Sequence, residues 1–242
     1  MLSNLVCIPL ILKTLPNDDI RKNDSQQLQI LVNSNKELIK IPVSNINLKE
    51  NIKEEINKII NTSNFHLEQV YTLGEDEYIT DRKIDIIYLA VTNIENIKDL
   101  KEEYQLIDID IHNNLIKLDK ETYQFKTKEK INNNNIEYYH EINVEDVEEK
   151  KKVLEILIAY KHLRNKLDNS DILFKFLPKY FTLEETRTLY EKLKETTTDK
   201  SNFRKKIIKY CKETSKNTDK KGFRPSKLYT FKVLKGDIWL WF

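Results

Sequence analysis

Short apolar segments separated by polar loops run through the N-terminal part of the chain, and this pattern predicts a series of β-strands. The predicted strands cover residues 4–13, 27–33, 37–43, 65–73 and 83–91. Isoleucines at helical spacing predict one helix over 48–60. Residues 107–111 and 115–118 predict a short hairpin that turns at Asn113 and Asn114, and 132–135 is predicted to be an exposed loop.

A longer helix is predicted over residues 144–167, because its apolar positions repeat at helical intervals. These positions are Val153, Ile156, Leu157, Tyr160 and Leu163. We expect this helix to link two domains and, because its stripe is longer than one domain face requires, to contribute to a dimer. The alternative is burial inside one subunit. The aromatic tail at 238–242 is expected to add to that contact or to dock on the chain's own core.

Two short helices are predicted next. Thr182 is a suitable N-cap for the first, with Glu185 placed to bond back. Its apolar side holds Leu183, Leu189, Tyr190 and Leu193. Residues 196–198 predict a turn, and Asp199 is a good N-cap for a second helix over 200–212.

The second helix is amphipathic and basic. Its apolar face is predicted to hold Phe203, Ile207, Tyr210 and Cys211. The opposite face is predicted to hold Ser201, Asn202, Lys205, Lys209 and Lys212, with Arg204 and Lys206 flanking the apolar stripe. Such a face suits the major groove of DNA, where Asn can read adenine and Lys or Arg can reach guanine or phosphate. A solvated basic helix without a partner is the alternative.

A basic hairpin follows this helix. Residues 216–221 are polar and basic, Gly222 and Pro225 allow a turn, and 227–231 alternate like a strand. A helix, a turn, a second helix and then a basic hairpin form the outline of a winged helix, whose wing contacts a neighbouring groove or the backbone.

Charge is distributed unevenly along the 242 residues. Residues 1–150 hold 18 basic and 28 acidic side chains, a net of −10, whereas 151–242 hold 23 and 11, a net of +12. This asymmetry favours an acidic domain joined to a nucleic-acid-binding one. The two cysteines and four histidines have no zinc-site spacing, and the apolar run at 5–12 is too short to cross a membrane, so we expect a cytoplasmic protein.

The C-terminal part of the chain resembles the winged helix of the Nudix-related transcriptional regulators, the NrtR family. The matching text is RNKL at 164–167, LPKYFTL at 177–183, LYE at 189–191, DKSNFRKK at 199–206 and RPSKLY at 224–229. HLEQVYTLG at 66–74 and YLAV at 88–91 resemble the strands after the Nudix helix. Ser201 departs from the family, which often has a basic residue there.

This resemblance implies an α+β fold with three parts. A Nudix-like α/β sandwich would occupy 1–143, a linker helix 144–168 and a winged helix-turn-helix domain 169–242. It also implies a homodimer on a palindromic double-stranded DNA operator. The implied effector is small: ADP-ribose, a molecule related to NAD, or a sugar.

The Nudix box, which holds the metal-binding acids in catalytic relatives, is degenerate here. Aligned on Ile41 and Pro42, it keeps its first acid as Glu50, but the positions of the other metal ligands hold non-acidic residues. Ser44, Lys58, Ile59, Thr62, Ser63 and Phe65 replace the motif's Gly, Arg, three Glu and closing Gly. Ile cannot ligate Mg²⁺, so no catalytic residue, metal or cofactor is expected. The alternative is a nucleoside diphosphate hydrolase with an atypical metal site.

The predicted DNA contacts lie on the two short helices and the wing. They are Thr182, Lys200, Ser201, Asn202, Arg204, Lys205, Lys206, Lys209, Lys221, Arg224 and Lys227. Arg82 and Lys83 are the candidates for an anionic effector, with solvated loop charges as the alternative. An adaptor that binds RNA or protein is a further alternative, although the chain lacks the exposed aromatic pairs of common single-strand RNA modules.

Overall fold

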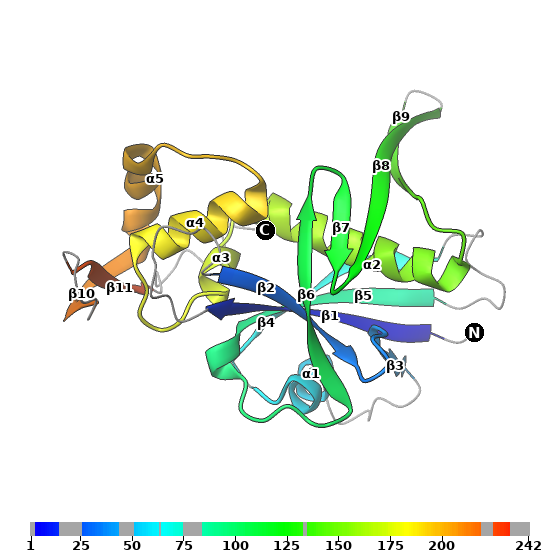
Figure 1. Ribbon diagram of the computed structural model, residues 1–242, viewed down its shortest axis with the longest axis horizontal. Helices are drawn as coiled ribbons and strands as arrows, with labels where there is room; N and C mark the ends of the chain where they lie inside the picture. The colour runs from blue at the N-terminus through cyan, green and yellow to red at the C-terminus, as the bar shows by residue number, and fades with distance from the viewer. Residues whose placement is uncertain are drawn as a thin grey trace.

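The N-terminal domain is built on one mixed sheet of nine strands (Figure 1). The structure is a computed structural model that describes residues 3–14, 26–43, 51–62, 64–74, 84–132, 135–218 and 225–232. The strands are β1 Ser3–Thr14, β2 Gln26–Asn33, β3 Ile39–Pro42, β4 His66–Leu73, β5 Ile84–Asn93, β6 Tyr104–His112, β7 Leu115–Leu118, β8 Glu121–Asn132 and β9 Asn135–Ile142. Their order is β4-β5-β1-β2-β6-β7-β8-β9, with β3 beside β1; β1 and β5 run parallel.

Strand β1 is buried on both faces, and its sequence explains how. Successive side chains of a strand point to opposite sides of the sheet. Val6, Ile8 and Leu10 therefore join the larger hydrophobic cluster, while Cys7 and Ile11 join a smaller cluster on the other face. A central strand of this kind requires a covering layer on each side of the sheet.

Helix α1, Ile52–Ile60, covers the face with the smaller cluster. Asn51 caps it, accepting a hydrogen bond from the Glu54 N–H while the Glu54 side chain accepts from Asn51. Ile56 and Ile60 are fully buried against the sheet. The short 3₁₀ helix η4, Ile94–Asn96, follows β5.

Helix α2, Val147–Lys166, covers the opposite face (Figure 1). Asp146 caps it by accepting from the Glu149 N–H at 2.8 Å. Its last residue, Lys166, donates to Glu68 on β4 at 3.0 Å. No helix among the residues that the structure describes is both long and apolar enough to cross a membrane.

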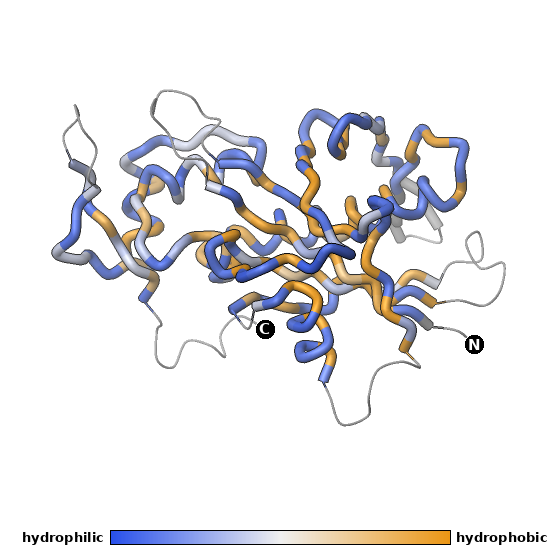
Figure 2. Tube along the Cα trace, turned by 60° about the horizontal axis from the view of Figure 1, so that its bottom comes forward, coloured by the Kyte–Doolittle hydropathy of each residue, from blue (hydrophilic) through white to orange (hydrophobic). Residues whose placement is uncertain are grey.

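The winged helix continues from α2 without a separate linker. It comprises α3 Ile172–Lys175, α4 Leu183–Lys194, α5 Lys200–Ile207, the 3₁₀ helix η5 Ile208–Tyr210, and the antiparallel strands β10 Cys211–Asn217 and β11 Lys227–Phe231. Hydrophobic stretches run along the central strands, and hydrophilic segments lie mostly at the periphery (Figure 2).

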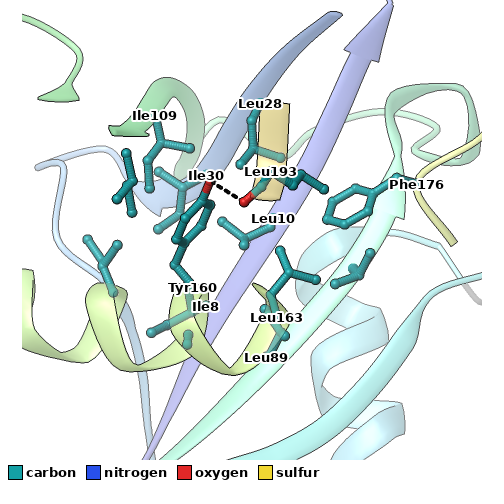
Figure 3. Packing of buried hydrophobic residues seen from close by; sticks show 14 of the residues in the cluster. Ile8, Leu10, Leu28, Ile30, Leu89, Ile109, Tyr160, Leu163, Phe176 and Leu193 are labelled. Carbon is teal, nitrogen blue, oxygen red and sulfur yellow. Dashed lines mark hydrogen bonds between the residues drawn. The ribbon is translucent and has the colours of Figure 1, made fainter. Parts of the chain in front are cut away.

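One hydrophobic core joins the sheet, α2 and the winged helix. Ile30 of β2, Leu163 of α2 and Leu193 of α4 belong to the same buried cluster, together with Phe176. The Tyr160 hydroxyl on α2 donates to the Leu193 carbonyl at 3.3 Å within this cluster (Figure 3). The two domains therefore bury apolar surface against each other through α2.

Hydrogen bonds between buried or partly buried polar groups also join the sheet to the winged helix. The Asn93 side-chain amide on β5 donates to the Phe176 carbonyl at 2.7 Å, and both residues are fully buried. Gln26 donates to the Glu185 carbonyl at 3.1 Å, and Lys192 donates to the Gln26 carbonyl at 2.8 Å. Hydrogen bonds between buried groups depend on geometry, so they fix the orientation of α4 against the sheet.

The structure confirms the predicted strands and the 107–118 hairpin, and it contains the predicted long helix over Val147–Lys166. Three expectations were wrong or incomplete. The α2 stripe is buried inside one subunit, so it is not a spare face for a dimer. Strands β8 and β9 were not predicted, because most of β8 is polar. The second short helix ends at Ile207, not at residue 212. The tail at 238–242 lies outside the described residues.

Glu155 on α2 is a buried acid within this core region. It is 0% exposed, and its carboxyl group shares a side-chain hydrogen bond with Asp85. Burial raises the pKa of Glu155 to about 8, and the negative charge of Asp85 acts in the same direction, while Lys40 and Lys151 oppose it. The carboxyl group is therefore protonated in the folded chain at neutral pH.

We expect Glu155 to make the folded chain less stable as pH rises. The unfolded carboxyl loses its proton near its ordinary pKa, while the folded one keeps it up to about pH 8. The stabilisation is present below about pH 4 and declines by up to ~1.4 kcal/mol per pH unit across the window that ends near pH 8. Glu155→Gln should abolish this slope in chemical denaturation, and Glu148→Gln, an exposed change on the same helix, should keep it. Parallel curves for wild type and Glu155→Gln would contradict the assignment.

Candidate nucleic-acid interface

Helix α5 is held by its apolar face against the rest of the winged helix. Asp199 caps it, accepting from the Asn202 N–H at 2.8 Å. Phe203 and Ile207 are buried, and the Phe203 ring lies 5.5 Å from that of Tyr190 on α4. Anchoring one face fixes which side chains point away from the domain.

The outward face of α5 is basic and carries no acidic residue. Its exposed residues are those predicted to contact DNA: Lys200, Ser201, Asn202, Arg204, Lys205 and Lys206, with Lys209 in the following η5 turn. Among the described residues, no partner is found for the side chains of Asn202 and Lys205. A short helix with an amide and free cations on one side has the chemistry needed to contact base edges and phosphates.

Two cations of this helix are already paired. Lys206 lies 2.9 Å from Asp168 at the end of α2, and Lys200 lies 3.2 Å from Glu184 on α4. Asp168 also accepts from Lys194 at 2.7 Å and from the Tyr190 hydroxyl at 2.7 Å. The hydrogen bond from Lys194, together with those from Tyr190 and Lys206, holds the pKa of Asp168 well below its usual range. A phosphate would have to compete with these carboxylates.

Thr182 has a structural position. Its side chain is 6% exposed, and its hydroxyl accepts from the Glu185 N–H at 3.1 Å. The Glu185 carboxylate accepts from the Thr182 N–H at 2.7 Å, which completes the predicted capping box. Because the hydroxyl is occupied and covered, Thr182 is left out of the DNA-contacting set proposed below.

The wing is a two-stranded ribbon pinned to the segment before α4. Phe181 and Tyr229 exchange two backbone hydrogen bonds of 3.0 and 2.8 Å. Lys227 on β11 lies 3.0 Å from Glu213 on β10. Lys212, predicted on the helix, lies on β10 opposite Thr230. Lys221 and Arg224, predicted at the wing, fall outside the described residues.

A cation and aromatic cluster beside the wing was not predicted. The Lys216 ammonium lies 4.1 Å from the centre of the Tyr180 ring, and the Lys179 ammonium lies 5.6 Å from it. Lys179 and Tyr180 are neighbours in the sequence but Lys216 is distant from both, so only the basic segment around Lys216 signalled this surface.

Two positions of the segment predicted to be a degenerate Nudix box, Ile59 and Phe65, pack in the core. Ile59, at a metal-ligand position, is 9% exposed and packs in the smaller cluster. The Thr62 hydroxyl accepts from the Asn64 N–H at 3.1 Å. Ser44, Glu50 and Ser63 lie outside the described residues, as do the effector candidates Arg82 and Lys83. Within the described ranges, no three His, Cys, Asp or Glu side chains come together as a possible metal site.

A family model identifies the C-terminal part of the chain. Residues 173–231 match the NrtR DNA-binding winged helix domain. Among curated proteins, none matches the chain.

Solved structures match nearly the whole chain in fold. A MutT/nudix family protein from Enterococcus faecalis has a TM-score of 0.61 at 17% identity, covering 96% of this chain and 88% of that one. NrtR of Shewanella oneidensis has a TM-score of 0.61 at 14% identity, covering 96% and 94%. The same protein complexed with a 27mer DNA has a TM-score of 0.59 at 15% identity, covering 95% and 93%. Residues 173–231 therefore form a winged helix of the NrtR DNA-binding type, and the whole chain shares its fold with NrtR and a MutT/nudix family protein.

Proposed function

We propose that this NrtR-like, DNA-binding chain is a transcriptional regulator whose Nudix-like domain senses a small effector without catalysis. The observation that carries the proposal is the outward face of α5. Its acid-free row of exposed residues is fixed by the burial of Phe203 and Ile207 on the opposite side. Binding to chromosomal DNA would place the protein in the cytoplasm.

The side chains divide by the contact that each can make. Asn202 and Lys205 lie opposite the buried face and have no partner among the described residues, and they are proposed to reach base edges, with Ser201 beside them. The remaining cations are proposed to contact phosphates or act from the wing; they are Lys200, Arg204, Lys206, Lys209, Lys221, Arg224 and Lys227. Lys206 would exchange its ion pair with Asp168 for a phosphate.

We further propose that two copies bind a palindromic operator. The support is the likeness to NrtR, because symmetric operators match symmetric dimers. The buried α2 stripe does not supply the contact, so another surface must do so. The effector is proposed to be ADP-ribose, a molecule related to NAD, or a sugar, which would favour one dimer arrangement.

We expect the free chain to be a dimer at low micromolar concentration. Light scattering should then give about twice the 29.0 kDa of one chain. A single species with the mass of one chain, both free and on DNA, would count against the dimer.

We expect no hydrolysis of ADP-ribose or other nucleoside diphosphates with Mg²⁺ or Mn²⁺. The ligand position of Ile59 lies in the core, where an apolar side chain cannot hold a cation. The measurement is metal-dependent phosphate or nucleotide release. The alternative, a hydrolase with an atypical metal site, would be supported by activity that disappears in Glu50→Gln.

DNA titrations should distinguish the loss of a base contact from the loss of a phosphate contact. A duplex selected from a random pool and its scrambled version would be titrated at several salt concentrations. Asn202→Ala should lose roughly 1–3 kcal/mol mainly on the selected duplex, because it removes a base contact. Lys209→Ala should weaken both duplexes and reduce the salt slope by about one, because it removes a phosphate contact.

Lys117→Ala, an exposed change on β7 far along the chain from the winged helix, is the matched control and should alter neither duplex. If Asn202→Ala and Lys205→Ala both leave the ratio of the two affinities unchanged, α5 does not read bases. Preference for single-stranded RNA of the same length would favour the adaptor alternative.

A further inference from the structure

A pocket of about 400 Å³ lies where the two domains meet. Helix α1, the start of β4 and η4 line one side, while α3 and β11 line the other. The residues that define its chemistry are Lys53, Asn64, Phe65, Phe174, Lys175 and Phe231. None of the described residues that line the pocket is acidic. Its volume is within the range of small-molecule sites.

The pocket has one lysine from each domain, and each lysine lies over an aromatic ring. The Lys53 ammonium is 5.5 Å from the centre of the Phe65 ring. The Lys175 ammonium is 5.6 Å from the centre of the Phe231 ring and 2.9 Å from Asp171, which does not line the pocket. Two cations on a wall without acids favour an anion between them.

The other lining groups suit a flat, polar molecule. Phe65 and Phe174 are nearly buried, and the Phe174 and Phe231 rings lie 4.6 Å apart. The Asn64 side-chain amide donates to Asn96 at 2.9 Å, so both amides at the rim are held in place. Aromatic walls accept a stacked ring, and fixed amides orient its polar edge.

We propose that this pocket binds a small phosphorylated molecule with a planar ring, of the nucleoside monophosphate class. The phosphate lies between Lys53 and Lys175, and the ring lies against the phenylalanine side chains. This site deepens the proposed function, because it would be where an effector touches both domains. It does not depend on Arg82 or Lys83.

The same aromatic cluster leads from the pocket to the DNA-binding elements. The centre of the Phe174 ring lies 6.3 Å from that of Tyr210, which ends the η5 turn after α5. It lies 5.8 Å from the centre of the Phe181 ring, and Phe181 pairs with the wing. A ligand held by Lys53 of one domain and Lys175 of the other therefore restrains the winged helix relative to the sheet.

The test is isothermal titration of the full chain, without DNA, using adenosine 5′-monophosphate, adenosine and inorganic phosphate. The monophosphate should bind at least about ten-fold more tightly than either fragment, because it alone uses both halves of the pocket. The double variant Lys53→Gln and Lys175→Gln should weaken its binding by about ten-fold or more. Lys117→Gln should leave it unchanged, and thermal unfolding should show that every variant is folded.

Three results would overturn the assignment. Absence of saturable binding of the monophosphate removes the site. Equal affinity for inorganic phosphate would show that the ring does not contribute to binding. Unchanged binding in the folded double variant would show that the monophosphate does not bind in this pocket. Because no arm contains DNA, a chain that binds the monophosphate but no duplex would contradict the regulator proposal and leave this site standing.

Discussion

The packing of α2 between the sheet and α4 is the interaction on which the rest of the structure depends. Tyr160 and Leu163 contact the core under β1 and β2, and the Tyr160 hydroxyl also reaches the Leu193 carbonyl of the winged helix. Removing this helix would expose an apolar face on each domain at once. The two parts are thus physically continuous through packed side chains.

In the Nudix-like domain, helix α1 is held to the sheet by an apolar face. A helix position can either face a cation or pack in a core, and Ile59 packs with Ile56 and Ile60. Packing of this kind strengthens the attachment of α1 to the sheet.

Cations of the winged helix serve both the fold and the proposed partner. Lys194 and Lys206 both form ion pairs with Asp168. No partner is found for the Asn202 and Lys205 side chains among the described residues. Ion pairs at a surface contribute little to stability, but they do set where a side chain rests before it meets DNA. In the proposed complex, Asn202 and Lys205, which have no partner among the described residues, read sequence, and the paired lysines exchange a carboxylate for a phosphate.

The sequence by itself determined the local features. The caps at Thr182 and Asp199, the apolar run of β1 and the basic face of α5 each depend on residues only a few positions apart, so short-range patterns were sufficient. Only the tertiary structure decided where α5 ends, because β11 draws residues from Cys211 onward into a ribbon. It also decided that the polar strand β8 forms and that the α2 stripe is buried within one chain. Those outcomes depend on residues that are distant in sequence, and a local sequence pattern does not specify which distant element will pack against it.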